Sequence, residues 1–389
     1  AHRSVTMRSV QVIVASLLRP GAAPPTLAAM SPVTRSLITT TSNPLLERAL
    51  RDKLQRRAET IGSLGELEPL ALRIGLIQNT LKPRLREPQL VLFASDHGLA
   101  VEGLPTAPGH GTAERAQQAL TGQLPVSVFA RIQGMALSVV DAGVAERLPP
   151  HERLLMRKIA HGTRNARVGA AMSVDQAQAA IRAGMEIGES LPGNLLACAG
   201  IGVGGHESAA LVLSRLAGVP VRELLQDRPD MDPNRLTHLL VITQAAQGRH
   251  RDVTDPVEVL AAFGGFEIAM MVGVMLVAAG RRHLVMVDGL PACAALMVAA
   301  RIAASVTDYC VFCRSHGHNG LDYALNMFHT SAVLELGMDS TDGTGATLAW
   351  PLLRAACALL SEVAEGEDPG PSRPGSIDSQ MGALSSGLS

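Results

Sequence analysis

One short stretch near the C-terminus combines a carboxylate with a glycine loop. Asp342 directly precedes Gly343, Thr344 and Gly345, and an apolar helical pattern follows. The backbone N–H groups of such a loop can face an anion at the start of the helix. A carboxylate fixed beside a bound anion is well placed to act as a general base. The alternative interpretation is that Asp342 only caps the helix, because Asp is favoured at helix N-termini.

Three apolar runs elsewhere in the chain are each followed by an Asp. They lie at residues 90–94, 137–140 and 284–287. Runs without alternation are typical of buried parallel strands, and open α/β sheets bind ligands at the carboxyl ends of their strands. The sequence therefore predicts a polar ligand crevice formed by Ser95, Asp96, His97 and Asp288, with Asp141 near it. The alternative is that some of these acids cap the helices that follow.

A fourth apolar run, residues 195–199, opens into a glycine loop at residues 200–205 and then a helical pattern. This arrangement of strand, glycine loop and helix is typical of phosphate sites. The loop lacks the Gly-Lys-Ser/Thr of a Walker loop and the spacing of a dinucleotide fingerprint. We expect Gly202, Gly204 and Gly205 to bind a mononucleotide phosphate. The alternative is close packing of the helix on the strand through glycine.

Two cysteines and two histidines, Cys310, Cys313, His316 and His318, lie close enough in sequence to suggest zinc. The residues around Cys310 have the pattern of a buried strand, in which neighbouring side chains face opposite sides. The two cysteines would then not converge, so we expect no metal. We expect Ser315 and the two histidines on a loop at the strand's carboxyl end, beside the ligand crevice.

The composition limits the class of protein. The 389 residues can bury a large core, and 47% of them are hydrophobic although only 2% are aromatic, which favours a packed α/β protein. A formal net charge of -1 argues against binding nucleic acid or an anionic membrane surface. The apolar run at 268–280 is too short to span a bilayer. Five cysteines do not form a disulfide framework, so a reducing cytoplasm is expected.

The two ends of the chain differ from the rest in composition. Residues 1–42 carry arginines, serines and a proline cluster but no acid, and we expect a disordered or extraneous extension, with a transit peptide as the alternative. Residues 43–364 hold the strand and helix patterns of the main domain. Residues 365–389 are rich in Gly, Pro and Ser without periodicity, which predicts a disordered tail.

Several longer motifs resemble the nicotinate-nucleotide:dimethylbenzimidazole phosphoribosyltransferase family, in order and over about residues 44–363. They are GSLG at 62–65, FASDHGLAVEG at 93–103, VVDAGV at 139–144, KIAHGTRN at 158–165, GGFEIAMM at 264–271, VDG at 287–289 and DGTGATLAWP at 342–351. The resemblance implies a doubly wound, largely parallel sheet with helices on both faces. It also implies a small helical domain, formed by residues 43–82 and the C-terminal helix, and a homodimer.

The same resemblance implies a glycosyltransferase reaction on a pentosyl group. The phosphoribosyl group of nicotinate mononucleotide passes to 5,6-dimethylbenzimidazole and gives α-ribazole 5′-phosphate and nicotinate, in the assembly of the cobalamin nucleotide loop. No metal or organic cofactor is implied.

Two motifs depart from the pattern of that family. The family's base is the Glu of G-E-G-T-G, and Asp342, one methylene shorter, stands at its position. The family's phosphate loop, G-E-M-G-I-G-N-T, contains a Glu that Ile201 replaces here, or Cys198 in another register. His206 and Arg228 are candidates to hold the phosphate instead. A second hypothesis is therefore a non-catalytic member that binds a benzimidazole or a nucleotide as a sensor or partner subunit.

Overall fold

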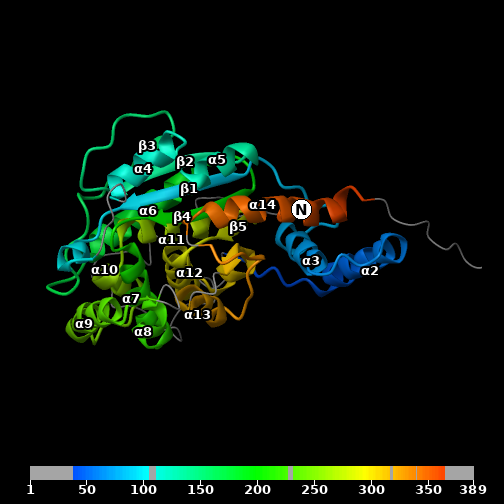
Figure 1. Cartoon of the computed structure of the whole chain (residues 1–389). Helices are drawn as coiled ribbons and strands as arrows, with labels where there is room; N and C mark the ends of the chain where they lie inside the picture. Colours follow the sequence, from blue (N-terminus) through cyan, green and yellow to red (C-terminus); the bar gives the residue numbers. More distant parts are fainter. Residues whose placement is uncertain (1–37, 105–110, 227–230, 316–318, 339, 364–389) are drawn as a thin grey trace, which may run out of the picture.

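A six-stranded parallel sheet forms the centre of the protein (Figure 1). The computed structural model describes residues 38–104, 111–226, 231–315, 319–338 and 340–363. The strand order is β3-β2-β1-β4-β5-β6, and all paired strands run parallel. The strands are β1 (Gln89–Ser95), β2 (Ala136–Gly143), β3 (Leu154–Met156), β4 (Leu195–Ile201), β5 (Leu284–Val287) and β6 (Cys310–Phe312). A separate parallel pair consists of β7 (Arg314–Ser315) and β8 (Leu334–Glu335).

The sheet is doubly wound, as predicted. The chain moves outward from β1 through β2 to β3 and then returns to the other side of β1, where β4 pairs. The carboxyl ends of β1 and β4 therefore flank the topological switch point, which is where open α/β sheets bind ligands. Every residue of β1 and β4 is buried, which explains why both strands lack polar alternation.

Helices cover both faces of the sheet (Figure 1). One face carries α4 (Thr112–Leu120), α5 (Pro125–Ile132) and α14 (Thr344–Ser361), and the other carries α6 (Val174–Ser190), α11 (Phe266–Gly280) and α12 (Leu290–Ile302). Glycine lets α6 and α11 approach closely, because a Cβ on Gly184 would lie 2.0 Å from the carbonyl oxygen of Met270. Within the described ranges, no helix is both long and apolar enough to cross a membrane.

The remaining helices extend from these layers. They are α7 (Gly205–Ala217), α8 (Val221–Leu225), α9 (Pro233–Arg249), α10 (Pro256–Phe263), α13 (Asn319–Met327) and the 3-10 helices η2 (Gly98–Glu102) and η3 (Ala304–Tyr309). Figure 1 shows α7, α8, α9 and α13 together beyond α12. This group continues the second layer away from the sheet.

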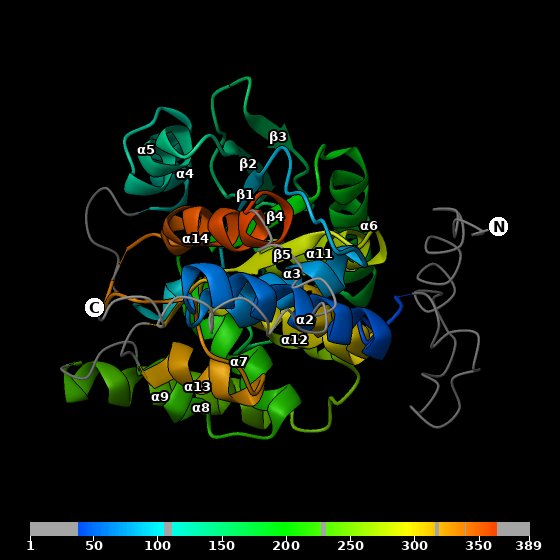
Figure 2. The ribbon, with the colours of Figure 1, turned by 90° about the vertical axis from the view of Figure 1, so that its right-hand side faces the viewer.

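The two ends of the described chain pack on each other. Helices α2 (Pro44–Ile61) and α3 (Leu67–Gln78) lie beside α14 (Figure 2). Nη1 of Arg57 donates to the carbonyl of Leu359, and Sγ of Cys357 donates to the carbonyl of Pro83 at 3.2 Å. This packing agrees with the expected small helical part, whose status as a separate domain stays a prediction.

Ordered packing begins before residue 43, earlier than the sequence suggested. Ile38 is buried, Thr39 accepts a hydrogen bond from the hydroxyl of Tyr309 at 2.7 Å, and the amide of Thr41 donates to Asp308 at 3.0 Å. The prediction of a disordered or extraneous extension is therefore wrong for residues 38–42, which η3 holds in place. The rest of that extension and the predicted tail at 365–389 lie outside the described residues.

Candidate active site

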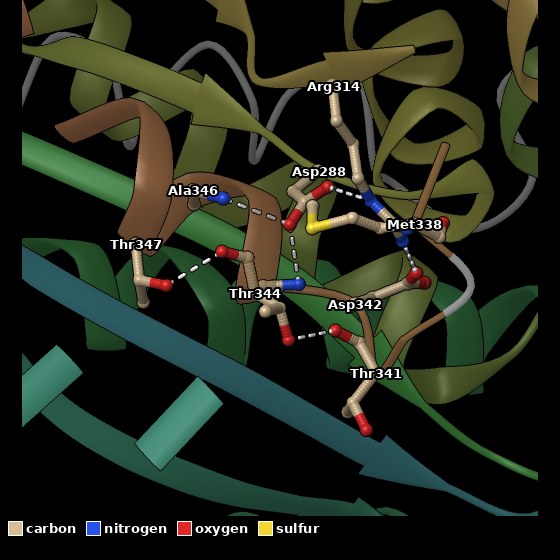
Figure 3. Close-up of polar contacts among 9 residues, drawn as sticks. Asp288, Arg314, Met338, Thr341, Asp342, Thr344, Ala346 and Thr347 are labelled. Carbon is tan, nitrogen blue, oxygen red and sulfur yellow. Dashed lines mark hydrogen bonds and ion pairs between the residues drawn. The ribbon is translucent and has the colours of Figure 1, made fainter. Parts of the chain in front are cut away.

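Arg314 lies between two carboxylates at the carboxyl ends of β5 and β6 (Figure 3). Its Nε donates to Oδ1 of Asp288 and its Nη2 donates to Oδ1 of Asp342, both at 2.7 Å. Its Nη1 donates to the carbonyl of Met338 at 3.0 Å. The side chains of Arg314 and Asp288 are 5% and 0% exposed, whereas that of Asp342 keeps 21% of its surface accessible. Asp342 is therefore the member of this trio that a ligand can reach most easily.

Asp288, and not Asp342, caps helix α14. Oδ2 of Asp288 accepts the amide hydrogens of Gly343 at 2.7 Å and Ala346 at 3.1 Å. A carboxylate is stabilised at this end of a helix by the N–H groups and the helix dipole. Protein donors therefore bind both oxygens of Asp288, which links Arg314 to the start of α14. The predicted contact of Asp288 with substrate stays a prediction. Of the loop N–H groups expected to face an anion, that of Gly343 binds Asp288, and that of Thr344 donates to the carbonyl of Thr341 at 3.2 Å.

Two glycines make room for the side chains of this trio. Gly289 has φ of +91°, and a Cβ there would lie 2.2 Å from the carboxyl carbon of Asp342. A Cβ on Gly345 would lie 2.8 Å from Cδ of Arg314. Thr344 supports the turn by donating from Oγ1 to the carbonyl of Thr341 at 2.7 Å (Figure 3). The glycine after β5 and the glycine loop thus serve the placement of Asp342 and Arg314.

The environment of Asp342 brings its pKa close to neutrality. Burial raises the pKa of Asp342 to about 6, although the positive charge of Arg314 acts in the opposite direction. Asp288 adds to the rise, and His206 on α7 opposes it. Burial also lowers the pKa of Arg314, but Asp288 and Asp342 outweigh that effect and raise it, so Arg314 stays protonated. A carboxylate with such a pKa is suited to general-base catalysis.

A second buried pair lies at the switch point between β1 and β4. Nε2 of His97 is 2.9 Å from Oε1 of Glu267, and each side chain is 1% exposed. Glu267 reaches this place because α10 ends at Gly264 and α11 begins after Gly265, so Glu267 lies in the first turn of α11. Burial lowers the pKa of His97, but the nearby carboxylates, with Glu267 first, outweigh it and raise the pKa. The carboxylate of Glu267 therefore favours the protonated form of the imidazole.

The loop after β4 packs directly against the end of β1. A Cβ on Gly202 would lie 2.2 Å from the carbonyl oxygen of Ser95, and Gly204 has φ of +86°. The amide of Val203 donates to Oγ1 of Thr112 at 3.0 Å, and that of Gly205 donates to the carbonyl of Gly202 at 3.1 Å. Close packing therefore requires a glycine at 202. Phosphate binding by Gly202, Gly204 and Gly205 stays a prediction.

The acids at the other strand ends bind backbone amides. Oδ2 of Asp96 accepts the amide hydrogen of Ala145 at 2.7 Å, and Oδ1 of Asp141 accepts that of Val144 at 3.0 Å. Asp141 also pairs with Lys158 at 3.2 Å. Asp96 and Asp141 thus both bind the backbone that follows β2, and Asp288 is the strand-end acid that joins the Asp342 site.

The sulfur atoms of Cys310 and Cys313 lie in the core. Both residues are buried, and Sγ of Cys310 donates to the carbonyl of Val306 at 3.4 Å. In the described part of the chain, no three His, Cys, Asp or Glu side chains form a group that could hold a metal. Ser315 follows Arg314 on β7, whereas His316, His318 and Arg228 lie outside the described residues.

Comparison with known proteins identifies the family. A family model described as a phosphoribosyltransferase, DBI_PRT, matches residues 40–370. The nicotinate-nucleotide–dimethylbenzimidazole phosphoribosyltransferase of Cupriavidus taiwanensis is 40% identical over 324 residues, which cover 82% of this chain and 92% of that relative. The protein of the same name from Cupriavidus necator is 40% identical over 326 residues, covering 82% of this chain and 94% of the relative. The chain belongs to this phosphoribosyltransferase family.

Solved structures of the family share the fold. The crystal structure of nicotinate-nucleotide–dimethylbenzimidazole phosphoribosyltransferase from Thermus thermophilus superposes with a TM-score of 0.76 at 30% sequence identity. The match covers 82% of this chain and 96% of that one. A structure of CobT from the same organism gives a TM-score of 0.77. The predicted family and the predicted doubly wound fold are confirmed.

The sequence did not reveal the partners of two site residues, namely Arg314 beside Asp342 and Glu267 beside His97. Arg314 directly follows the buried run 310–313, so an arginine at the end of an apolar strand was the available signal. Because Val287 pairs with Phe312 in the sheet, the residues that follow both strands lie side by side. Glu267 is buried and is the second residue of α11. An acid within a long apolar stretch was the signal that a buried partner lies nearby.

Proposed function

We propose that this chain transfers the phosphoribosyl group of nicotinate mononucleotide to 5,6-dimethylbenzimidazole. The products are α-ribazole 5′-phosphate and nicotinate. The observation that carries the proposal is Asp342, a partly accessible carboxylate with a pKa raised to about 6, fixed at the start of α14. The names of the relatives, which span most of the chain, support the choice of substrates.

In the proposed reaction Asp342 acts on the acceptor base. Its carboxylate removes the proton from one benzimidazole nitrogen, while the other nitrogen attacks the anomeric carbon of the ribose. The bond between that carbon and the nicotinate nitrogen breaks, nicotinate leaves with the bonding electrons, and the proton passes from Asp342 to solvent. General-base catalysis of this kind contributes on the order of 10²–10⁴-fold in rate.

A direct assay tests this function. Purified chain is incubated with nicotinate mononucleotide and dimethylbenzimidazole, and the products are separated by chromatography. We expect α-ribazole phosphate from the wild type and from Asp342→Glu, and a loss of about 10²-fold or more in kcat for Asp342→Asn, with nucleotide affinity near the wild-type value. Wild-type turnover in Asp342→Asn would place the base elsewhere, with Glu207 the next candidate.

The second candidate function is a non-catalytic member that binds a benzimidazole or a nucleotide. The observation that favours it is the ion pair between Arg314 and Asp342, which lowers the basicity of a carboxylate already shorter than the family's Glu. This candidate holds if wild type and Asp342→Glu bind dimethylbenzimidazole in calorimetry but form no α-ribazole phosphate.

We propose that the nucleotide phosphate lies between the loop that starts α7 and the turn formed by Gly343, Thr344 and Gly345. Gly205 offers a sharp test, because an added Cβ would meet its nearest neighbour, Nε2 of His97, at an ordinary 3.5 Å. Gly205→Val should therefore fold while its branched side chain shields the loop's N–H groups. We expect weaker binding of nicotinate mononucleotide and unchanged binding of dimethylbenzimidazole in calorimetry. Unchanged nucleotide affinity would contradict this placement.

The remaining proposed substrate contacts are Ser95, Asp96, His97, Asp288 and Ser315, which end or follow strands of the sheet. The family also supports the proposal of a homodimer, which light scattering coupled to size-exclusion chromatography tests. A monomer at micromolar concentration would contradict it.

A further inference from the structure

We infer that Arg314 is the positioning residue of Asp342, holding Oδ1 so that Oδ2 is the oxygen that accepts the proton. This inference deepens the proposed function and rests on it. Arg314 touches no reacting atom in this scheme, because it acts through the carboxylate it holds.

The position of Arg314 is determined from three sides. Its Nε, Nη2 and Nη1 donate to Asp288, Asp342 and the carbonyl of Met338, at 2.7, 2.7 and 3.0 Å. Asp288 is itself fixed, since it ends β5 and caps α14. The arginine stem passes over Gly345, where any Cβ would collide with it. A planar guanidinium held by three acceptors has few alternative orientations.

The two oxygens of Asp342 therefore have different roles. Oδ1 accepts a charge-assisted hydrogen bond from Arg314, whereas Oδ2 has no hydrogen bond to any described residue. When a proton arrives at Oδ2, Oδ1 becomes the carbonyl oxygen of a carboxylic acid and still accepts the hydrogen bond. The carboxyl group therefore keeps its place through proton transfer, and misplacement of a reacting group by ~1 Å can cost on the order of 10²-fold in rate.

Titratable groups from several elements face Asp342. Arg314 after β6, Asp288 after β5 and His206 on α7 are the charged or titratable groups that act on Asp342. Cys293 on α12 also faces it, but burial raises the pKa of this thiol, so it stays uncharged. Arg115 on α4 donates to Oγ1 of the adjacent Thr341 at 2.5 Å. Arg314 is the largest of the influences that lower the pKa of Asp342. Removal of its charge should therefore raise that pKa further.

Two substitutions separate the charge of Arg314 from its geometry. Arg314→Gln removes the charge, so we expect the acidic limb of the kcat–pH profile to move to higher pH and kcat at pH 7 to fall about 10–100-fold. Arg314→Lys keeps the charge but cannot bridge three acceptors, so we expect the limb to stay in place while kcat falls at every pH.

Arg282→Gln is the matched control. Among the residues that the structure describes, Arg282 donates to the carbonyls of Leu76 and Ile77 and to the hydroxyl of Thr39, away from Asp342. We expect it to lower the melting temperature without moving the acidic limb. If Arg314→Gln is folded and behaves like this control, or keeps the wild-type profile, Arg314 has only a structural role and the inference is wrong.

A measurement without turnover separates this inference from the proposed function. Carboxyl ¹³C NMR of chain labelled at aspartate assigns Asp342 as the resonance absent from Asp342→Asn. We expect it to titrate at higher pH in Arg314→Gln than in the wild type, whether or not the chain is active. An unchanged titration would overturn the inference, and an inactive wild type with a shifted titration would overturn only the proposed reaction.

Discussion

The amide of Gly343 donates to Oδ2 of Asp288 at 2.7 Å across 55 positions of the chain. This bond joins the end of β5 to the start of α14, and Asp342 is the residue directly before it. The candidate base is therefore held by the cap of the helix that follows it as well as by Arg314.

Replacement of Asp288 should destabilise the protein strongly. Asp288→Ala removes the cap of α14 and leaves the buried guanidinium of Arg314 with one carboxylate partner instead of two. Because loss of one partner of a buried ion pair costs about 3–5 kcal/mol, we expect a decrease of that order in the free energy of unfolding, measured by urea denaturation.

Asp255→Ala is the control for the cap alone. Asp255 accepts the amide hydrogens of Val257 and Glu258 at the start of α10 but pairs with no cation among the described residues. For Asp255→Ala we expect the free energy of unfolding to decrease by about 1 kcal/mol. Equal losses in both variants would show that the charge of Asp288 contributes little.

Turnover should require the ionised form of Asp342. Because its pKa is raised to about 6, the fraction ionised rises through that pH and is nearly complete at pH 8. We expect kcat to fall about tenfold for each pH unit well below 6 and to be level above about pH 7. A pH profile of single-turnover rates, in which product release is not limiting, is the measurement. A flat profile from pH 5 to 8 would exclude Asp342 as the base.

Gly289→Ala should impair the site far beyond its cost in backbone strain. The new methyl group would start 2.2 Å from the carboxyl carbon of Asp342, so the carboxylate must move. We expect kcat to fall about 100-fold. Gly218→Ala is the control, because Gly218 has a similar φ of +69° but no atom within 4 Å of the added Cβ. It should lose stability but keep kcat, and a Gly289→Ala enzyme with normal kcat would contradict the described position of Asp342.

Glu267→Gln should lower stability mainly at acidic pH. The folded-state pKa of His97 is raised, so its protonation stabilises the fold fully below the unfolded pKa of about 6.5, and this contribution is lost as pH rises through the folded pKa. Removal of the carboxylate should lower the free energy of unfolding by about 3 kcal/mol at pH 5.5 and by less at pH 9. Glu47→Gln, in an exposed pair with Arg51, should change little at either pH. Equal losses at both pH values would show that His97 is not charged in the fold.

The strands that form the site could be predicted because each is a short apolar run without alternation. Gln89–Ser95 and Leu195–Ile201 extend the predicted runs by one or two residues at their ends, and Leu284–Val287 agrees with its prediction. The position of Asp342 before a glycine loop was equally visible. These features depend on local sequence, on which burial and turn chemistry leave clear patterns.

The partnerships between the site residues could not be predicted from local patterns. Arg314 meets Asp342 only because β5 pairs with β6 in one register and α14 begins where β5 ends. The cap of α14 comes from Asp288, 55 positions earlier, although Asp342 stands at the expected capping place. Long-range pairing decides which of two nearby acids binds the amides and which stays accessible.

Helix α14 is the last described element of the chain, and it carries the N–H groups that Asp288 binds. During synthesis, the ends of β1 and β4 and the glycine loop after β4 emerge well before it. Until α14 docks, Asp288 lacks the amides it caps and Arg314 lacks its second carboxylate. A chain that stops before residue 342 therefore keeps the loop after β4 but has no base, and the site becomes complete only when the start of α14 docks at the end of β5.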